Sequence, residues 1–159
     1  ARPFAAFATW RCSLGGMLSR RTTSAPASNA SFASSSDVTS ISTRIEPRDK
    51  HLRSPDFFDV AKFPKITFTS QKIVKRGPSA MTVTGPLTIR DVTKPVTLAV
   101  TGLGVPVKGM DGKLRLGLQA TTTLSRKEFG LTWNKLLEAG GAMVGDKVSV
   151  LLNLQLVKK

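Results

Sequence analysis

The chain contains no tyrosine, and its 159 residues include one cysteine and one histidine. The single cysteine, Cys12, excludes an internal disulfide and a metal site built from several cysteines. One histidine, His51, gives little from which to assemble a nucleophile, a base and an orienting group. We therefore expect a protein that is not an enzyme and that needs neither a metal nor another cofactor.

Long apolar runs are also missing, since none approaches the ~20 residues that a membrane-spanning helix needs. The apolar stretch PFAAFATW near the start is short, and Arg11 ends it, so it is not a convincing secretory signal. We therefore expect no transmembrane segment. The compartment, cytoplasmic or periplasmic, stays open.

Acidic side chains are scarce: 10 Asp and Glu stand against 24 Lys and Arg, which gives a net charge of +14. This balance favours anionic partners such as nucleic acid, anionic lipid or a phosphorylated ligand. The basic residues are scattered, and aromatic residues make up only 6% of the chain, so platforms for stacking bases are few. We expect no specific nucleic-acid partner.

The chain changes character near residue 37. Residues 1–36 hold no Asp, Glu or Lys and are rich in Ala, Ser and Thr, whereas residues 37–159 carry all ten acidic residues. The first part is typical of a disordered tail, an organellar transit peptide or an artefact of reading frame. We therefore predict an atypical or disordered segment over 1–36 and one folded domain over 37–159.

Apolar and polar residues alternate with a period of two through most of the second part, which is typical of half-buried antiparallel strands. The predicted strands are 66–70, 81–90, 95–102, 113–124 and 147–159, with 41–44 as the end of a sixth. Asp111-Gly112 is a strong hairpin signal between two of them. The pattern predicts an all-β fold, a meander that curls into a barrel or sandwich, whose aliphatic face either fills with side chains or encloses a ligand.

One short helix is expected after residue 54. Ser54 is a good N-cap, Pro55 suits the first helical position, and Asp56 and Asp59 suit the positive end of a helix. Pro64 would end it after barely two turns.

Four stretches together resemble the YceI-like family in order and spacing: RDKHLRSPDFFDVAKFPKITF (48–68), VTGPLTIRDVTKPVTL (83–98), LSRKEFGLTWN (124–134) and VGDKVSVLLNLQLVKK (144–159). The resemblance covers about residues 37–159. It implies a lipocalin-like antiparallel β-barrel. It also implies transport or storage of a polyisoprenoid lipid, such as a polyprenyl phosphate or an isoprenoid quinone, in an apolar tunnel.

The resemblance turns the aliphatic strand faces into candidates for the lining of that tunnel: Ile66, Phe68, Val83, Leu87, Ile89, Val96, Leu98, Leu114, Leu116, Leu118, Val148, Val150 and Leu152. For a phosphate or quinone head group the candidates are His51, Arg53 and Arg126, with Trp133 and Asn134 nearby. Arginine suits phosphate because its planar guanidinium donates two parallel hydrogen bonds.

Residues 1–36 do not resemble the N-terminal strands of the family, which leaves open whether the barrel closes on that side. Two alternatives to lipid binding stay open as well. One is a basic barrel that binds single-stranded nucleic acid, and the other is a barrel fragment without function. A homodimer is a further option, because unpaired sheet edges invite pairing with another chain.

Overall fold

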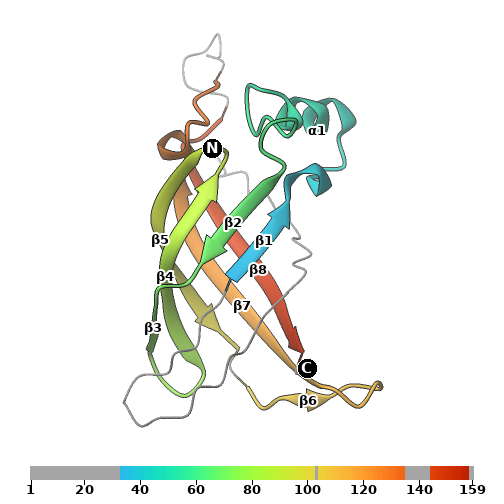
Figure 1. Ribbon diagram of the computed structural model, residues 1–159, viewed down its shortest axis with the longest axis vertical. Helices are drawn as coiled ribbons and strands as arrows, with labels where there is room; N and C mark the ends of the chain where they lie inside the picture. Colours follow the sequence, from blue (N-terminus) through green and yellow to red (C-terminus); the bar gives the residue numbers. More distant parts are fainter. Residues whose placement is uncertain (1–32, 103, 135–143, 158–159) are drawn as a thin grey trace.

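A computed structural model describes residues 33–102, 104–134 and 144–157 (Figure 1). Within them the chain forms one antiparallel sheet, one α-helix and two 3-10 turns. The elements in chain order are β1 (Ala33–Asp37), η1 (Val38–Ser40), α1 (Glu46–Arg53), β2 (Lys65–Thr69), β3 (Lys72–Lys75), β4 (Ala80–Ile89), β5 (Val92–Thr101), β6 (Val107–Lys108), β7 (Leu114–Ser125), η2 (Arg126–Phe129) and β8 (Lys147–Val157).

The sheet follows the order β1-β2-β4-β5-β7-β6, with β3 paired to β4 and β8 paired to β7. It curls into a half-barrel whose two outer strands are β1 and β8 (Figure 1). The predicted all-β, lipocalin-like antiparallel architecture is confirmed. Over the described residues the half-barrel stays open, because no pairing joins β1 to β8 there.

The five strands expected from alternation are present as β2, β4, β5, β7 and β8. Three short strands, β1, β3 and β6, were not predicted, and residues 41–44, expected to end a strand, are irregular. The sequence of β1 is ASSSD, which has no apolar alternation; this strand is held by its register with β2, from Ala33 opposite Thr69 to Asp37 opposite Lys65. The compositional boundary at residue 37 therefore falls at the end of β1, and residues 1–32 lie outside the described residues.

Strands β4 and β5, each of ten residues, form a hairpin in which Pro86 lies opposite Pro95. Proline donates no ladder hydrogen bond, so both positions need an unpaired outer side. Pro95 has one, because β5 pairs with β7 only over 99–101. Pro86 lies where the neighbour of β4 changes from β2 to β3. There Gly85 lets the backbone of Thr69 approach closely, because a Cβ at Gly85 would stand 1.9 Å from the carbonyl oxygen of Thr69.

The helix lies earlier than predicted, at Glu46–Arg53, and the expectation of a helix after residue 54 was wrong. Pro47 occupies the first turn, where its missing N–H is harmless. Pro55 disfavours helical geometry in the residue before it, and Ser54 is indeed extended, with φ −73° and ψ 168°. Ser54 thus ends α1 instead of starting a helix. Residues 54–63 form turns in which Asp59 has a left-handed φ of 46°.

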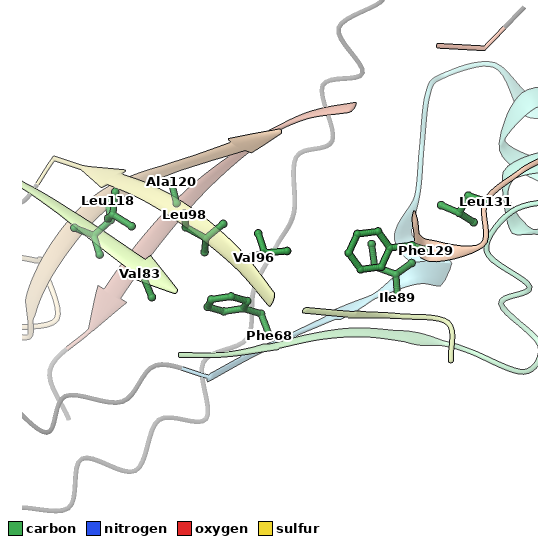
Figure 2. Close-up of a cluster of buried hydrophobic side chains, with 10 residues drawn as sticks. Phe68, Val83, Ile89, Val96, Leu98, Leu118, Ala120, Phe129 and Leu131 are labelled. Atoms are coloured by element: carbon green, nitrogen blue, oxygen red, sulfur yellow. The ribbon is translucent and has the colours of Figure 1, made fainter. Parts of the chain in front are cut away.

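The buried core follows the concave side of the sheet (Figure 2). Phe68 of β2, Val83 of β4, Leu98 of β5 and Leu118 of β7 face one another along it, and all are less than 9% exposed. Figure 2 shows the row continuing to Phe129, Ile89 and Leu131, at the end of the sheet near α1. The core therefore connects the sheet to the elements that cover this end.

Candidate functional site

The concave face of the half-barrel gathers most of the predicted tunnel lining. Six candidates are buried in the core cluster: Phe68, Val83, Ile89, Val96, Leu98 and Leu118. Four more are half-buried and pack against it: Ile66, Leu87, Leu116 and Leu152. Val148 and Val150 are half-buried outside that cluster, and Leu114 is 38% exposed on the β6–β7 hairpin. The structure thus separates side chains that fill the core from side chains that remain accessible on the concave face.

Sequence reasoning missed part of this surface. Leu154 and Leu156 of β8 lie directly opposite Leu118 and Leu116 of β7 and pack half-buried against the core. Their alternation with Asn153 and Gln155 placed them on the same face as Leu152, so the period-two pattern contained the signal. Phe129 and Leu131 were missed for a different reason: they belong to a 3-10 turn and its exit, where no period exists to follow.

Three aromatic rings form a cluster beside the end of α1. The ring of His51 stands edge-on to Trp133 at 4.6 Å between centroids and to Phe57 at 5.0 Å, and Phe57 lies 5.3 Å from Trp133. Phe57 is buried, whereas Trp133 is half-buried and the side chain of His51 is 37% exposed. The Nε2 atom of His51 lies 3.1 Å from a carboxylate oxygen of Asp56. Two of the five head-group candidates, His51 and Trp133, are therefore in direct contact.

The buried side chain of Arg126 holds several backbone segments together. Its side chain is only 4% exposed, and its guanidinium donates to the backbone carbonyls of Gly145, Leu131, Trp133 and Val144. A fifth partner, the carboxylate of Asp146, lies 3.5 Å from the same group. The guanidinium thereby ties the turn after β7 to the start of β8. Its donors are therefore engaged within the protein.

Asn134 adds two hydrogen bonds to the same segment before β8. Its side-chain amide donates to the carbonyl of Val144 at 2.8 Å and accepts from the N–H of Val144 at 3.0 Å, as a paired strand residue would. Arg53, the remaining candidate, lies in the last turn of α1 and donates to the carbonyl of Ile41 at 2.6 Å. Its Nε is buried without a hydrogen-bond partner. Arg53 therefore keeps one donor that the described residues do not satisfy.

A buried carboxylate anchors the loop before α1. Asp49 accepts hydrogen bonds from the hydroxyl and the N–H of Thr43, and its side chain is 3% exposed. The hydroxyl of Thr43 is the main cause that holds the pKa of Asp49 below its usual value, with the backbone N–H of Thr43 and the charge of Arg53 adding to it against the effect of burial. The hydrogen bonds from Thr43 therefore favour the ionised form of Asp49 in the loop that leads into α1.

A cleft of about 250 Å³ opens between β5 and β7, where the two strands part. Its lining consists of Lys94, Pro95, Val96, Thr97, Thr122, Thr123, Leu124, Ser125, Glu128 and Phe129. Val96 and Phe129 belong to the buried core, so the cleft borders the apolar interior. Hydroxyl groups, one lysine and one glutamate surround it, which makes it a polar opening beside an apolar surface.

The described residues contain no group of three or more His, Cys, Asp or Glu side chains that could hold a metal ion. In the same part of the chain, none of the helices has the length and apolar character needed to cross a bilayer.

The sequence matches a known protein family and several curated proteins. The family model described as the YceI-like domain matches residues 8–156. A UPF0312 protein of Staphylococcus aureus strain USA300 is 40% identical over 109 residues, as is the UPF0312 protein of strain COL. The match covers 69% of this chain but 61% of each relative, so the chain spans less than two thirds of the length of the curated relatives it matches.

Solved structures share the fold. A YceI protein of Campylobacter jejuni superposes with a TM-score of 0.69 at 23% identity, covering 91% of this chain and 94% of that one. BcnA of Burkholderia cenocepacia gives a TM-score of 0.67 at 24% identity, covering 86% of this chain and 80% of its own. At these identities the likeness shows the common sheet architecture.

Proposed function

Because the chain belongs to the YceI-like domain family, we propose that it binds a polyisoprenoid lipid, for transport or storage, along the concave face of its half-barrel. The role is one of binding without a chemical step. The observation that carries the proposal is the band of half-buried aliphatic side chains, Ile66, Leu87, Leu116 and Leu152, that lies over a packed apolar core.

The chemistry of an isoprenoid tail fits this band. The tail is insoluble because its carbons meet water, and each methylene-sized unit that is buried contributes about 0.8 kcal/mol. Aliphatic side chains from β2, β4, β7 and β8 offer such burial without directional contacts, so tails of different lengths can be accommodated. Ordering the flexible tail offsets much of the gain, and affinity therefore depends on how much of the tail is covered at once.

The polar head is proposed to lie near the end of α1, where His51 and Arg53 share the last helical turn. Arg53 adds a positive charge at this end, with its unsatisfied Nε buried, and His51 presents a partly exposed ring against Trp133. A phosphate would accept from the histidine and be attracted by the charge of the arginine, and a quinone ring would pack on the aromatic cluster. A few polar groups at one end of an apolar surface are the usual source of specificity in small-molecule sites.

The experiment compares two arginine substitutions in one strand. Leu116→Arg places a charge on the concave face, and Thr121→Arg places the same charge on the exposed opposite face of β7. Each purified protein is offered a polyprenyl phosphate and an isoprenoid quinone, and bound lipid is measured after gel filtration. We expect Leu116→Arg to abolish uptake and Thr121→Arg to retain it. Uptake that survives Leu116→Arg would place the ligand elsewhere.

A further inference from the structure

The β6–β7 hairpin projects from the end of the sheet opposite α1 (Figure 1). It carries a concentration of exposed apolar side chains. Six large apolar side chains are exposed among the described residues, and five of them lie on this hairpin, just before it or on the adjoining end of β8: Val105, Val107, Met110, Leu114 and Val157. The sixth, Ile45, precedes α1. Scattered exposed apolar residues are ordinary, but a contiguous group marks an interaction surface.

The exposed side chains occupy both faces of the hairpin and its tip. Val107 lies opposite Arg115, which in turn lies opposite Val157, so these three share one face. Leu114 lies opposite Lys108 on the other face, and Met110 in the connecting turn is fully exposed. A protein partner with a flat surface could cover only one face of the hairpin. A lipid bilayer, in contrast, can surround a projecting hairpin on all sides.

The turn itself is well defined. The N–H of Gly109 donates to the carbonyl of Lys113 at 2.8 Å, and that of Gly112 donates to the carbonyl of Gly109 at 2.9 Å. Gly112 has φ +75°, the left-handed geometry that this turn needs and that glycine supplies without strain. Met110 is therefore displayed at the tip by a hydrogen-bonded turn.

Basic residues flank the apolar tip. Arg115 is neutralised by Asp111, whose carboxylate lies 2.8 Å away. For Lys108 and Lys113 no acidic partner occurs among residues 33–102, 104–134 and 144–157. The hairpin thus presents two free cations beside its apolar tip, in a chain whose net charge is +14. Apolar side chains rimmed by lysine are the composition of segments that enter the interface of an anionic bilayer.

We propose that the β6–β7 hairpin docks this protein on anionic lipid bilayers, with Val107 and Met110 entering the interface and Lys108 and Lys113 contacting acidic head groups. The two lysines argue against a second copy of this chain as the occupant, because a two-fold contact would bring like charges together. Docking does not depend on polyisoprenoid binding, since it uses a separate end of the molecule and ordinary bilayer lipid.

The test is flotation of the full chain with isoprenoid-free vesicles of phosphatidylcholine, alone or mixed with phosphatidylglycerol. We expect binding to the mixed vesicles, weakened roughly tenfold or more by Val107→Ser with Met110→Ser, because apolar surface would no longer be buried. Lys108→Gln with Lys113→Gln should weaken it by a similar factor. Ile45→Ser is the matched control, an exposed apolar residue beside α1, and should bind as the unaltered chain does.

Circular dichroism and uptake of polyisoprenoid report whether each variant is folded, so a loss of vesicle binding can be assigned to the hairpin. Equal flotation of the serine variant and the unaltered chain would overturn the proposal, as would no flotation with either vesicle. Light scattering addresses the rival occupant. A dimer that the serine substitutions dissociate, together with no vesicle binding, would assign the hairpin to self-association instead.

Discussion

Arg126 shows how a single side chain can serve several segments at once. Four backbone carbonyls and one carboxylate surround its guanidinium, which is nearly inaccessible to water. In Arg126→Met these acceptors lose their donor in a buried place, so we expect the free energy of unfolding to fall by about 3–5 kcal/mol. Chemical denaturation measures this loss.

The neighbouring Lys127 is the control for Arg126. Its ammonium lies 2.7 Å from Asp146, but its side chain is 53% exposed, and exposed ion pairs contribute at most about 1 kcal/mol. Lys127→Met should therefore change stability by less than that. If both substitutions had the same small effect, the role described for Arg126 in holding these segments together would be wrong.

Asp49 gives the fold a dependence on pH. Its pKa in the folded protein lies below the ordinary value, chiefly because Thr43 donates to it. The ionised carboxylate therefore stabilises the fold at neutral pH, and this stabilisation is lost as the pH falls through the folded pKa. Asp49→Asn keeps an acceptor oxygen but removes the charge.

We expect Asp49→Asn to be less stable than the unaltered chain at about pH 7 and the difference to shrink below about pH 4, near the unfolded pKa of an aspartate. Urea unfolding at several pH values measures both curves. A difference that stays constant across this range would show that the charge of Asp49 does not matter.

At the scale of the elements, the close approach of the chain between β2 and β3 to the backbone of β4 depends on Gly85. A Cβ there would stand 1.9 Å from the carbonyl oxygen of Thr69, and backbone cannot move aside cheaply. We expect Gly85→Ala to lower the free energy of unfolding by about 1–3 kcal/mol or more, as forced overpacking does. Thermal or chemical unfolding provides the measurement.

Gly117 of β7 offers the matched position, a strand glycine at which an added Cβ would meet nothing within 4 Å. Gly117→Ala should be neutral, or stabilising by less than about 1 kcal/mol. Equal losses at both glycines would point to a general intolerance of the sheet and not to the close approach of Thr69 to Gly85.

The strands and the helix also show which parts of the fold the sequence could predict. Alternation identified β2, β4, β5, β7 and β8 because each has one buried face, and the same property identified most of the concave surface. Strand β1 has no such pattern because it is held by backbone pairing. The helix was misplaced because Ser54-Pro55 can begin a helix or end one, and the start signals of α1, Pro47 in its first turn with Glu46 and Asp49 beside it, were overlooked.

For the molecule as a whole, the architecture could be predicted and the chemistry of its ends could not. Local sequence gives no sign that Arg126 is buried, because its partners are carbonyls that the fold brings together from both sides of the turn. The contact between His51 and Trp133 likewise joins residues far apart in the chain. The half-barrel thus has a polar and aromatic end beside α1, an apolar band along its concave face and an exposed hairpin at the far end (Figure 1).

The central claim is that the apolar band holds a polyisoprenoid. The measurement that tests it most directly is mass spectrometry of the lipid extracted from the purified protein, with and without prior exposure to a polyprenyl phosphate or an isoprenoid quinone. We predict a near-stoichiometric isoprenoid in the unaltered chain and its absence from Leu116→Arg. A folded protein that carries no isoprenoid and takes up none when it is offered would contradict the claim.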